Sequence, residues 1–334
     1  MRVAGFGEIM LRLSTDKGMM LSNANNLNVN YGGGEANVLI SLSKFGMDTR
    51  AITKVSNDEI GEAIIDYLSS KKVETKFISK SDKRTGIYFL QKGSGNRTSK
   101  VIYDRDDSAF NNMKVEDLDI EKVLNGVDVF HFSGVTLALS ENLRKLTLNI
   151  LKYCKENNII VSYDSNYRAK LWSLEEASKA TFEILPYVNI LSAGILDAEN
   201  ILYMSCEYID KYEKLKYYYG EIINLYPNIR HIFSSIRENQ SVSVNTLQCN
   251  YYSNNNLYSS KAYIIDDIVD RVGGGDALTA GVLYGILNNK KPEYITEFAT
   301  SASVLKHSIK GDANLVSIEE VETLMNYGVG KILR

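Results

Sequence analysis

VDVFHFS (residues 127–133) is the first of four short apolar runs from which the fold of this chain is predicted. The other three also have the length and composition of buried strands: IIVSYD (159–164), VNILS (188–192) and HIFSSI (231–236). Between the runs, apolar residues recur at helical spacing over lengths sufficient for crossover helices, at 141–157, 174–185 and 208–226. This alternation is typical of βαβ units and predicts a parallel sheet in a three-layer α/β/α sandwich.

Two stretches interrupt the alternation, at about 12–31 and about 85–110. Both contain strand-like runs without an intervening helix, and TGIYFLQKGSGNRTSKVIYDRD (85–106) carries Gly93 and Gly95 where a hairpin would turn. Together they predict a small antiparallel sheet that projects from one domain spanning 1–334. A sheet beside the strand ends of a doubly wound domain is well placed to act as a lid over a site there.

The composition excludes several classes of function. The 334 residues include 38 Lys and Arg against 41 Asp and Glu, and a net charge of −3 does not favour nucleic acid as a partner. No apolar stretch approaches the ~18 residues that cross a membrane, and the first residues do not resemble a signal peptide, so we expect a soluble protein. The cysteines are odd in number and form no CxxC pair, which favours a reducing, cytoplasmic location. Three widely spaced cysteines and three scattered histidines predict no metal site and leave acid–base chemistry to a carboxylate.

The most specific motif is DRVGGGD (270–276), which precedes the helical pattern ALTAGVLYGILNN. The backbone amides of Gly273, Gly274 and Gly275, at the start of that helix, would form a nest for an anion such as phosphate. Asp276, in the first turn, has the chemistry to accept a proton from an attacking hydroxyl group. The alternative is that Asp276 only caps the helix. The motif is neither a GK[ST] P-loop nor a GxGxxG dinucleotide fingerprint.

A second glycine run, NYGGGEAN (30–37), also precedes a predicted helix, at 36–45. Its glycines allow the backbone to approach a ligand, and Asn37 offers a donor and an acceptor to a hydroxylated molecule. The alternative is a tight strand-to-helix turn. Arg105, at the end of the predicted hairpin, and Arg168, after the 159–164 strand, are suited to clamp a carboxylate, which suggests a sugar acid. The alternative for either arginine is a solvated ion pair with a nearby aspartate.

Taken together, NYGGGEAN, DSNYR (164–168) and DRVGGGD resemble motifs of the ribokinase-like (PfkB) carbohydrate kinase family. The resemblance covers nearly the whole chain, because further segments follow in the family's order: GFGEIMLRLS (5–14), TGIYF (85–89), IYDRDDSAF (102–110), SSIRE (234–238) and KGDANLVSIEEVE (310–322). It implies a ribokinase-like fold and, within the family, a likeness to kinases of the sugar acid 2-keto-3-deoxygluconate. ATP would then phosphorylate the C6 hydroxyl, with Mg²⁺ held by the phosphates and by water.

The resemblance also implies roles for individual residues. Asp276 is implied as the catalytic base, and the amides of Gly273, Gly274 and Gly275 as the anion hole. The residues implied to bind the sugar acid are Gly34, Asn37, Tyr88, Tyr103, Arg105 and Arg168. Those implied to lie beside the nucleotide phosphates are Asn166, Ser235, Arg237 and Glu238, with Asp197 supporting the magnesium and phosphate geometry indirectly.

Some positions depart from the family pattern. Gly194 stands where the family has Asn and Asp197 where Glu is common, so the resemblance is weakest around magnesium and phosphate. Gly274 stands where many relatives have Ala. The same scaffold serves fructokinases and other sugar kinases, and a non-catalytic sugar-acid-binding regulator would also keep the fold. A neutral sugar does not require the arginine pair, and a regulator does not require Asp276. Edge strands of such a lid can pair between subunits, so a homo-oligomer is compatible with this fold.

Overall fold

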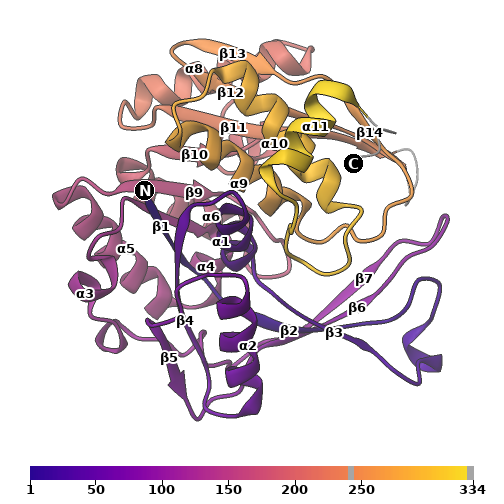
Figure 1. The fold of residues 1–334 in the computed structure, drawn as a ribbon. Coiled ribbons are helices and arrows are strands. Elements are labelled where there is room, and N and C mark those ends of the chain that lie inside the picture. The colour runs from indigo at the N-terminus through magenta and orange to yellow at the C-terminus, as the bar shows by residue number, and fades with distance from the viewer. Residues whose placement is uncertain (240–243, 329–334) are drawn as a thin grey trace.

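The computed structural model describes residues 1–239 and 244–328, and its central feature is one large sheet (Figure 1). Its strands are β1 Arg2–Phe6, β4 Asp48–Ser56, β5 Ile78–Ser81, β8 Val129–Ser133, β9 Ile160–Asp164, β10 Ile190–Ser192, β11 His231–Asn239, β12 Asn245–Ser253, β13 Asn256–Ser259 and β14 Tyr263–Ile265. They pair in the order β13-β12-β11-β10-β9-β8-β1-β4-β5, and β14 also pairs with β12. The strands from β1 to β11 run parallel, whereas β12 joins β11 in the antiparallel sense and so do β13 and β14 with β12.

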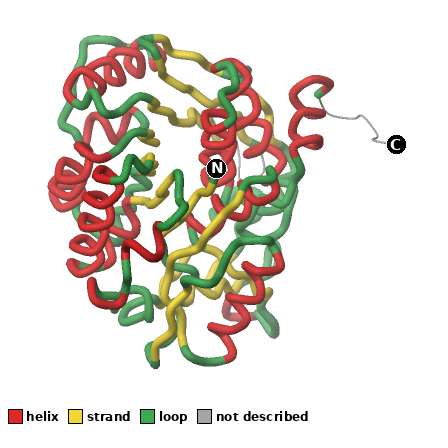
Figure 2. Tube along the Cα trace, turned by 60° about the vertical axis from the view of Figure 1, so that its left-hand side comes forward, coloured by secondary structure: helices red, strands yellow, loops and turns green. Residues whose placement is uncertain are grey.

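Helices cover both faces of this sheet as two outer layers (Figure 2). One layer consists of α1 Gly34–Lys44, α2 Glu59–Ser70, α9 Gly274–Leu287, α10 Pro292–Lys306 and α11 Ile318–Tyr327, whose buried apolar residues share one core cluster. The other consists of α3 Ile120–Leu124, α4 Gly134–Leu139, α5 Glu141–Glu156, α6 Leu174–Ile184, α7 Ile195–Asn200 and α8 Lys211–Leu225, which pack into a second cluster. The predicted three-layer α/β/α sandwich is confirmed.

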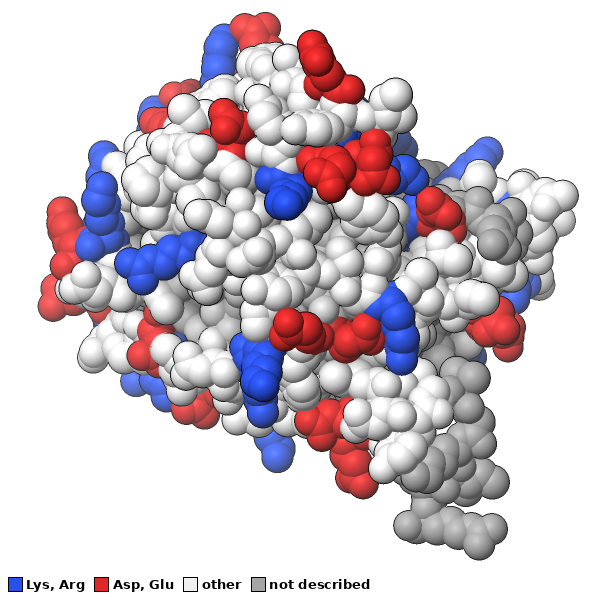
Figure 3. Space-filling view, turned by 90° about the horizontal axis from the view of Figure 1, so that it is seen from above, with Lys and Arg blue, Asp and Glu red and all other residues white. Residues whose placement is uncertain are grey.

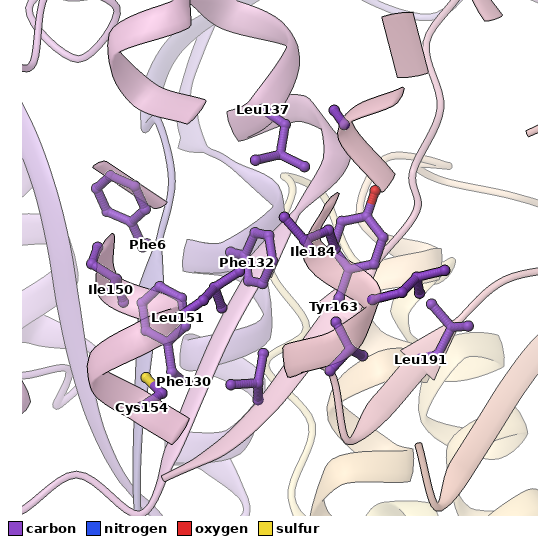
Figure 4. Packing of buried hydrophobic residues seen from close by; sticks show 14 of the residues in the cluster. Phe6, Phe130, Phe132, Leu137, Ile150, Leu151, Cys154, Tyr163, Ile184 and Leu191 are labelled. Atoms are coloured by element: carbon purple, nitrogen blue, oxygen red, sulfur yellow. The ribbon is translucent and has the colours of Figure 1, made fainter. Parts of the chain in front are cut away.

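The apolar runs become interior strands because both faces of the sheet are covered. All five residues of β8 are buried. Phe130 and Phe132 point into the cluster with α5, beside Leu151 and Cys154 (Figure 4), whereas Val129 belongs to the cluster on the opposite face. A strand that is buried on both faces requires a nearly continuous apolar sequence, as the 127–133 run provides.

The helices predicted between these strands occur with small shifts in their ends. α5 and α6 begin where predicted and end one residue earlier. α8 begins at Lys211 instead of residue 208, because the Asp210 side chain accepts hydrogen bonds from the amides of Tyr212 and Glu213 and so caps the helix. β10 covers only the last three residues of the predicted 188–192 strand.

A second, four-stranded sheet projects from the layered body (Figure 1). It consists of β2 Met10–Ser14, β3 Asn28–Gly32, β6 Ile87–Gln91 and β7 Lys100–Asp104, in the order β3-β2-β6-β7. Two hairpins are antiparallel as predicted, but β2 and β6 run parallel, so the prediction of a wholly antiparallel sheet is wrong. The reason is topological. β2 follows β1 and β6 follows β5, and both preceding strands point the same way in the large sheet.

The direction in which successive strands are added to the large sheet reverses between β1 and β8. It proceeds from β1 through β4 to β5, and then crosses to β8 on the other side of β1 and continues outward to β11. In open α/β sheets, ligands bind outside the carboxyl ends of the strands at such a reversal. The small sheet leaves the body at the same end, because only three residues separate β1 from β2.

Charges of both signs occur over the surface. On the face that Figure 3 shows, lysine and arginine side chains are interspersed with aspartate and glutamate. Within residues 1–239 and 244–328, no helix combines the length and the apolar character that a membrane span requires.

Candidate functional site

Two adjoining cavities lie at the carboxyl ends of the strands around the reversal. The first has a volume of about 540 Å³ and lies between the small sheet, the two glycine runs and the loop after β9. The second, of about 770 Å³, lies between that loop, the middle of β11 and helices α7 and α8. The residues that line both are Asp164, Asn166, Arg168, Ser235 and Arg237. Two cavities that share one wall suit two ligands that react where the cavities meet.

Gly273 turns the chain sharply into α9. Its φ of 82° is left-handed, and a Cβ there would collide with the carbonyl oxygen of Asp312, so only glycine fits. Gly273 is itself the N-cap of α9, and no side chain caps the helix. Asp276, three residues further on, is therefore not the N-cap of α9. The first amides of α9 lack partners within the helix and border the first cavity together with Asp276.

Asp276 lies among other carboxylates. Burial raises the pKa of Asp276 to about 7, and the negative charges of Asp164 and Glu35 add to this effect. Asn37 on α1 opposes it by donating from Nδ2 to Oδ2 of Asp276 at 2.7 Å, as does the charge of Arg168. Burial also raises the pKa of Asp164 to about 6. A carboxylate whose pKa lies near neutrality has the basicity of an efficient general base.

Close backbone approaches bring three segments together around Gly34. A Cβ on Gly33 would collide with the carbonyl oxygen of Glu8, so this glycine lets the start of α1 lie against the loop that joins β1 to β2. Asn166, after β9, has a left-handed φ of 40°, and its amide donates to Oδ1 of Asp164 at 3.2 Å. A Cβ on Gly34 would lie 3.7 Å from Nδ2 of Asn166 and 3.8 Å from Oδ1 of Asp276.

Arg105 and Arg168 line the same cavity but differ in their exposure and in their hydrogen-bond partners. Arg105 is 5% exposed and donates from Nε to Oε2 of Glu8 at 2.7 Å, with Nη2 in contact with the same oxygen. Arg168 is exposed, and Nη1 donates to the carbonyl oxygen of Tyr167 at 3.0 Å. Within the described residues, no carboxylate oxygen lies within 4.0 Å of its guanidinium. The solvated ion pair considered for Arg168 is therefore absent there, and Arg105 has a buried partner, Glu8.

A buried ionic network supports the glycine loop from behind. Arg12 on β2 is fully buried and donates to Asp270 and Asp312 at 2.6 Å each. Tyr88 on β6 donates its hydroxyl to Asp312. Lys306 donates to the carbonyl oxygens of Asp270 and Ile309 at 3.3 Å, and burial lowers its pKa to about 8. The network joins the small sheet to the loop that begins α9.

The second cavity contains two of the positions where the sequence departs from the family pattern, Gly194 and Asp197. The carboxylate of Asp197 accepts from Ser165 Oγ at 2.6 Å and from the Gly194 amide at 2.7 Å, so it closes the first turn of α7. Glu238 lines neither cavity and is exposed, with Lys211 at 3.0 Å. Across residues 1–239 and 244–328, no group of three or more His, Cys, Asp or Glu side chains is placed to hold a metal ion.

The structure brings most of the predicted site residues together. The first cavity is lined by the glycines and Asp276 of the DRVGGGD motif and by Gly34, Asn37, Tyr88, Tyr103, Arg105, Asn166, Arg168, Ser235 and Arg237. Asp197 lines only the second cavity.

Several residues of the site were not predicted from the sequence. Glu8 had a local signal, because it interrupts the apolar run directly after the first strand. Asp312 lies in KGDANLVSIEEVE, which resembles the family only as a segment. Arg12, Lys306 and His307 had no local signal, because their partners lie on other elements of the fold.

Comparisons with known proteins found a matching family and similar chains. The model of the family described as pfkB family carbohydrate kinase matches residues 2–318. The chain is 27% identical to a 2-dehydro-3-deoxygalactonokinase of Haloferax volcanii (97% of this chain, 96% of that protein) and 28% identical to a 5-dehydro-2-deoxygluconokinase of Clostridium beijerinckii (92% and 86%). The crystal structure of a 2-dehydro-3-deoxygluconokinase from Thermotoga maritima is 40% identical, with a TM-score of 0.94 over 97% of this chain and 99% of that one.

Proposed function

This chain belongs to the pfkB family of carbohydrate kinases, and we propose that it is a sugar-acid kinase that phosphorylates 2-keto-3-deoxygluconate. The proposed reaction transfers the γ-phosphoryl group of ATP to the C6 hydroxyl and yields 2-keto-3-deoxy-6-phosphogluconate and ADP. One observation carries the proposal: the basic carboxylate of Asp276, the glycine loop and two arginines border a single cavity.

In the proposed reaction, the C6 oxygen attacks the γ-phosphorus in line as its proton passes to Asp276. The new O6–P bond forms while the bond from phosphorus to the β,γ-bridging oxygen breaks, and ADP leaves with that oxygen. The amides of Gly274 and Gly275, at the positive end of α9, stabilise the negative charge on the transferring group. Asn37 holds Asp276 through its hydrogen bond, so the acceptor oxygen keeps a defined direction.

Substrate choice is assigned to the arginines. Arg168 is the more available of the two, because its guanidinium is exposed and has no carboxylate partner within the described residues. Glu8 fixes Arg105 in one orientation, and Nη1 of Arg105 makes no hydrogen bond within the described part of the chain. A guanidinium held in this way binds a substrate carboxylate without further loss of side-chain freedom.

ATP is assigned to the second cavity, with its phosphates toward the shared wall at Asn166, Ser235 and Arg237. The acidic residues that line this cavity, Asp164 and Asp197, offer the hard oxygen donors that Mg²⁺ prefers and would hold it through water. Bound there, Mg²⁺ neutralises part of the phosphate charge. A cytoplasmic location and a homo-oligomeric assembly stay predictions.

The alternatives differ in what they require of the site. A fructokinase needs Asp276 and the glycine loop but gains nothing from Arg168. A non-catalytic regulator needs the arginines but not the basic carboxylate. The galactonate epimer is a further candidate substrate, because one relative is named for it.

The test is a coupled assay of ADP release with 2-keto-3-deoxygluconate, 2-keto-3-deoxygalactonate and fructose. We expect the sugar acids to be the better substrates. Arg168→Ala should reduce kcat/KM for the sugar acid by roughly 10–150-fold, the value of one charge-assisted hydrogen bond, and should leave fructose nearly unaffected. Lysine at this position should restore only part of the activity, because it lacks the planar fork.

A matched control is Arg230→Ala. Arg230 is an exposed arginine directly before β11 and lines neither cavity, so its removal should change the activity with neither substrate. If fructose is the better substrate, or if Arg168→Ala affects both substrates equally, the sugar-acid assignment fails and the fructokinase alternative replaces it. If no sugar supports ADP release, the regulator alternative replaces both.

A further inference from the structure

His307 has a fixed protonation pattern where α10 ends. Its side chain is 1% exposed, and Nδ1 lies 2.6 Å from the carbonyl oxygen of Ser303. Because a carbonyl oxygen only accepts, Nδ1 carries the proton and Nε2 is left as an acceptor. Burial and the neighbouring charge of Arg237 lower the pKa of His307 to about 4, so the ring is neutral at physiological pH.

The acceptor nitrogen of His307 meets Arg237. Nη2 of Arg237 lies 3.2 Å from Nε2 of His307, and this guanidinium borders both cavities at their shared wall. Among residues 1–239 and 244–328, no carboxylate oxygen lies within 4.0 Å of it. A neutral acceptor fixes the direction of a guanidinium without neutralising its charge, which then remains available to an anion.

The glycine loop is shaped around the same ring. A Cβ on Gly274 would lie 2.5 Å from Cε1 and 3.0 Å from Nε2 of His307, and 3.4 Å from Nη2 of Arg237. Ser303, one turn before His307, donates from Oγ to the carbonyl oxygen of Gly274 at 2.7 Å. The imidazole therefore occupies the space that an alanine side chain at 274 would need, and the last turn of α10 is tied to the anion loop.

We propose that His307 is a positioning residue that holds Arg237 beside the glycine loop to bind the nucleotide's polyphosphate, and that residue 274 is glycine to make room for the imidazole. The inference rests on the proposed kinase function, because it assigns the polyphosphate to the shared wall. It deepens that function by naming a three-residue unit, Gly274–His307–Arg237, that no local motif indicates.

Two substitutions separate the two contacts of the imidazole. His307→Gln can place its amide oxygen near the position of Nε2 and so keep an acceptor for Arg237. His307→Asn can keep a donor near Nδ1 for Ser303 but removes the acceptor. We expect His307→Asn to raise the KM for MgATP and the Kd for MgADP by about 10-fold or more, with His307→Gln much closer to the unmutated protein. The KM for the sugar should change less than about twofold in both.

A double-mutant cycle tests whether His307 acts through Arg237. Arg237→Gln should weaken MgADP binding at least as much as His307→Asn does, and the two changes together should cost no more than Arg237→Gln alone. Additive losses would overturn the proposal, because they would mean that His307 contributes independently of Arg237. Isothermal titration calorimetry with MgADP gives these values without any turnover of sugar.

A second cycle tests the space around residue 274. Gly274→Ala should weaken MgADP binding because the methyl group displaces the imidazole. In a His307→Ala background the same change should cost little, because the space is empty. Equal losses in both backgrounds would overturn the steric part of the proposal.

Different results would contradict the kinase proposal and the proposed role of His307. If the unmutated protein binds MgADP but phosphorylates no sugar, the kinase proposal fails while both cycles can still be measured. If it phosphorylates the sugar acid but His307→Asn and His307→Gln both lower kcat and thermal stability and raise both KM values to a similar extent, then His307 is only structural and this inference is wrong.

Discussion

Asp276 is a partly buried carboxylate that lines the first cavity, and its surroundings work against its ionisation. Burial, followed by the charges of Asp164 and Glu35, raises its pKa to about 7 from an unfolded value near 3.8. A raised pKa means that the folded state binds the proton more tightly. The protonated carboxyl of Asp276 therefore makes its full contribution to the free energy of unfolding below pH 3.8. This contribution is lost as the pH rises through about 7. At the pH where the base is active, its charge destabilises the fold.

This electrostatic arrangement predicts a pH profile. In the free enzyme, kcat/KM should rise about tenfold per pH unit below pH 7 and level off above it, because only ionised Asp276 accepts the proton. Asn37→Ala should move the inflection to higher pH, since it removes the hydrogen bond that favours the ionised form. If the inflection came from ionisation of ATP instead, it would stay at the same pH in this variant. Rates that stay flat from pH 5 to 8 would show that Asp276 does not set the profile.

Asp276→Asn supplies the matched control for that profile. It should reduce kcat by roughly 10²–10⁴-fold, the usual scale for loss of a general base. The same variant should unfold at a higher temperature at pH 8, because a neutral amide replaces a charge that lies near the carboxylates of Asp164 and Glu35. Reduced activity together with lower stability would instead indicate that the substitution damages the fold.

At the scale of elements, the small sheet has little core of its own. Its apolar cluster consists of Met10, Tyr88 and Leu90, with Val101 and Val272 partly buried against it. We therefore predict that residues 88–106 exchange their amide hydrogens quickly without ligand and become protected when the sugar acid binds. The amides of β8, in the centre of the large sheet, serve as the reference and should not change. Equal exchange of residues 88–106 with and without the sugar acid would contradict the lid assignment.

The position of α9 depends on its contact with α10. A Cβ on Gly281 would lie 2.6 Å from Cα of Ala299, so the two helices approach at a point where only glycine fits. Gly281→Ala should lower the unfolding midpoint, by an amount equivalent to about 1–3 kcal/mol, and should also lower kcat because α9 carries Asp276. Gly220→Ala on α8 is the control. Its Cβ would meet only the Tyr252 hydroxyl, at 3.4 Å, and the gain in helix propensity should stabilise the protein. Similar effects of the two changes would contradict this account of the contact.

The sequence predicted elements better than it predicted how they meet. The strands around Phe130 and Tyr163 were recognisable because burial on both faces requires a continuous apolar run. The DRVGGGD loop was recognisable because Gly273 has a backbone angle that only glycine adopts easily. The parallel pairing of β2 with β6, and the contact of His307 with Arg237, depend on segments 70 or more residues apart, for which one sequence has no local signal.

At the scale of the whole molecule, the two core clusters share the large sheet, and the first cavity is bordered by residues from both sides of it. Asn37 and Asp276 come from helices of one layer, and Arg168 from the loop that leads to α6 of the other. A ligand that contacts both layers stabilises the folded chain as a unit. A ligand present at about 100 times its Kd adds about 2.7 kcal/mol to the free energy of unfolding.

We therefore predict one thermal transition that moves upward with each ligand. In differential scanning fluorimetry, 2-keto-3-deoxygluconate and MgADP should each raise the unfolding midpoint, and both together should raise it further, because they occupy adjoining cavities. Fructose at the same concentration should raise it less, since it lacks the carboxylate that Arg168 binds. MgADP controls for the fold, because its binding does not depend on the sugar. Two transitions, each moved by only one ligand, would mean that the layers unfold separately and that the cavities are not coupled through the sheet.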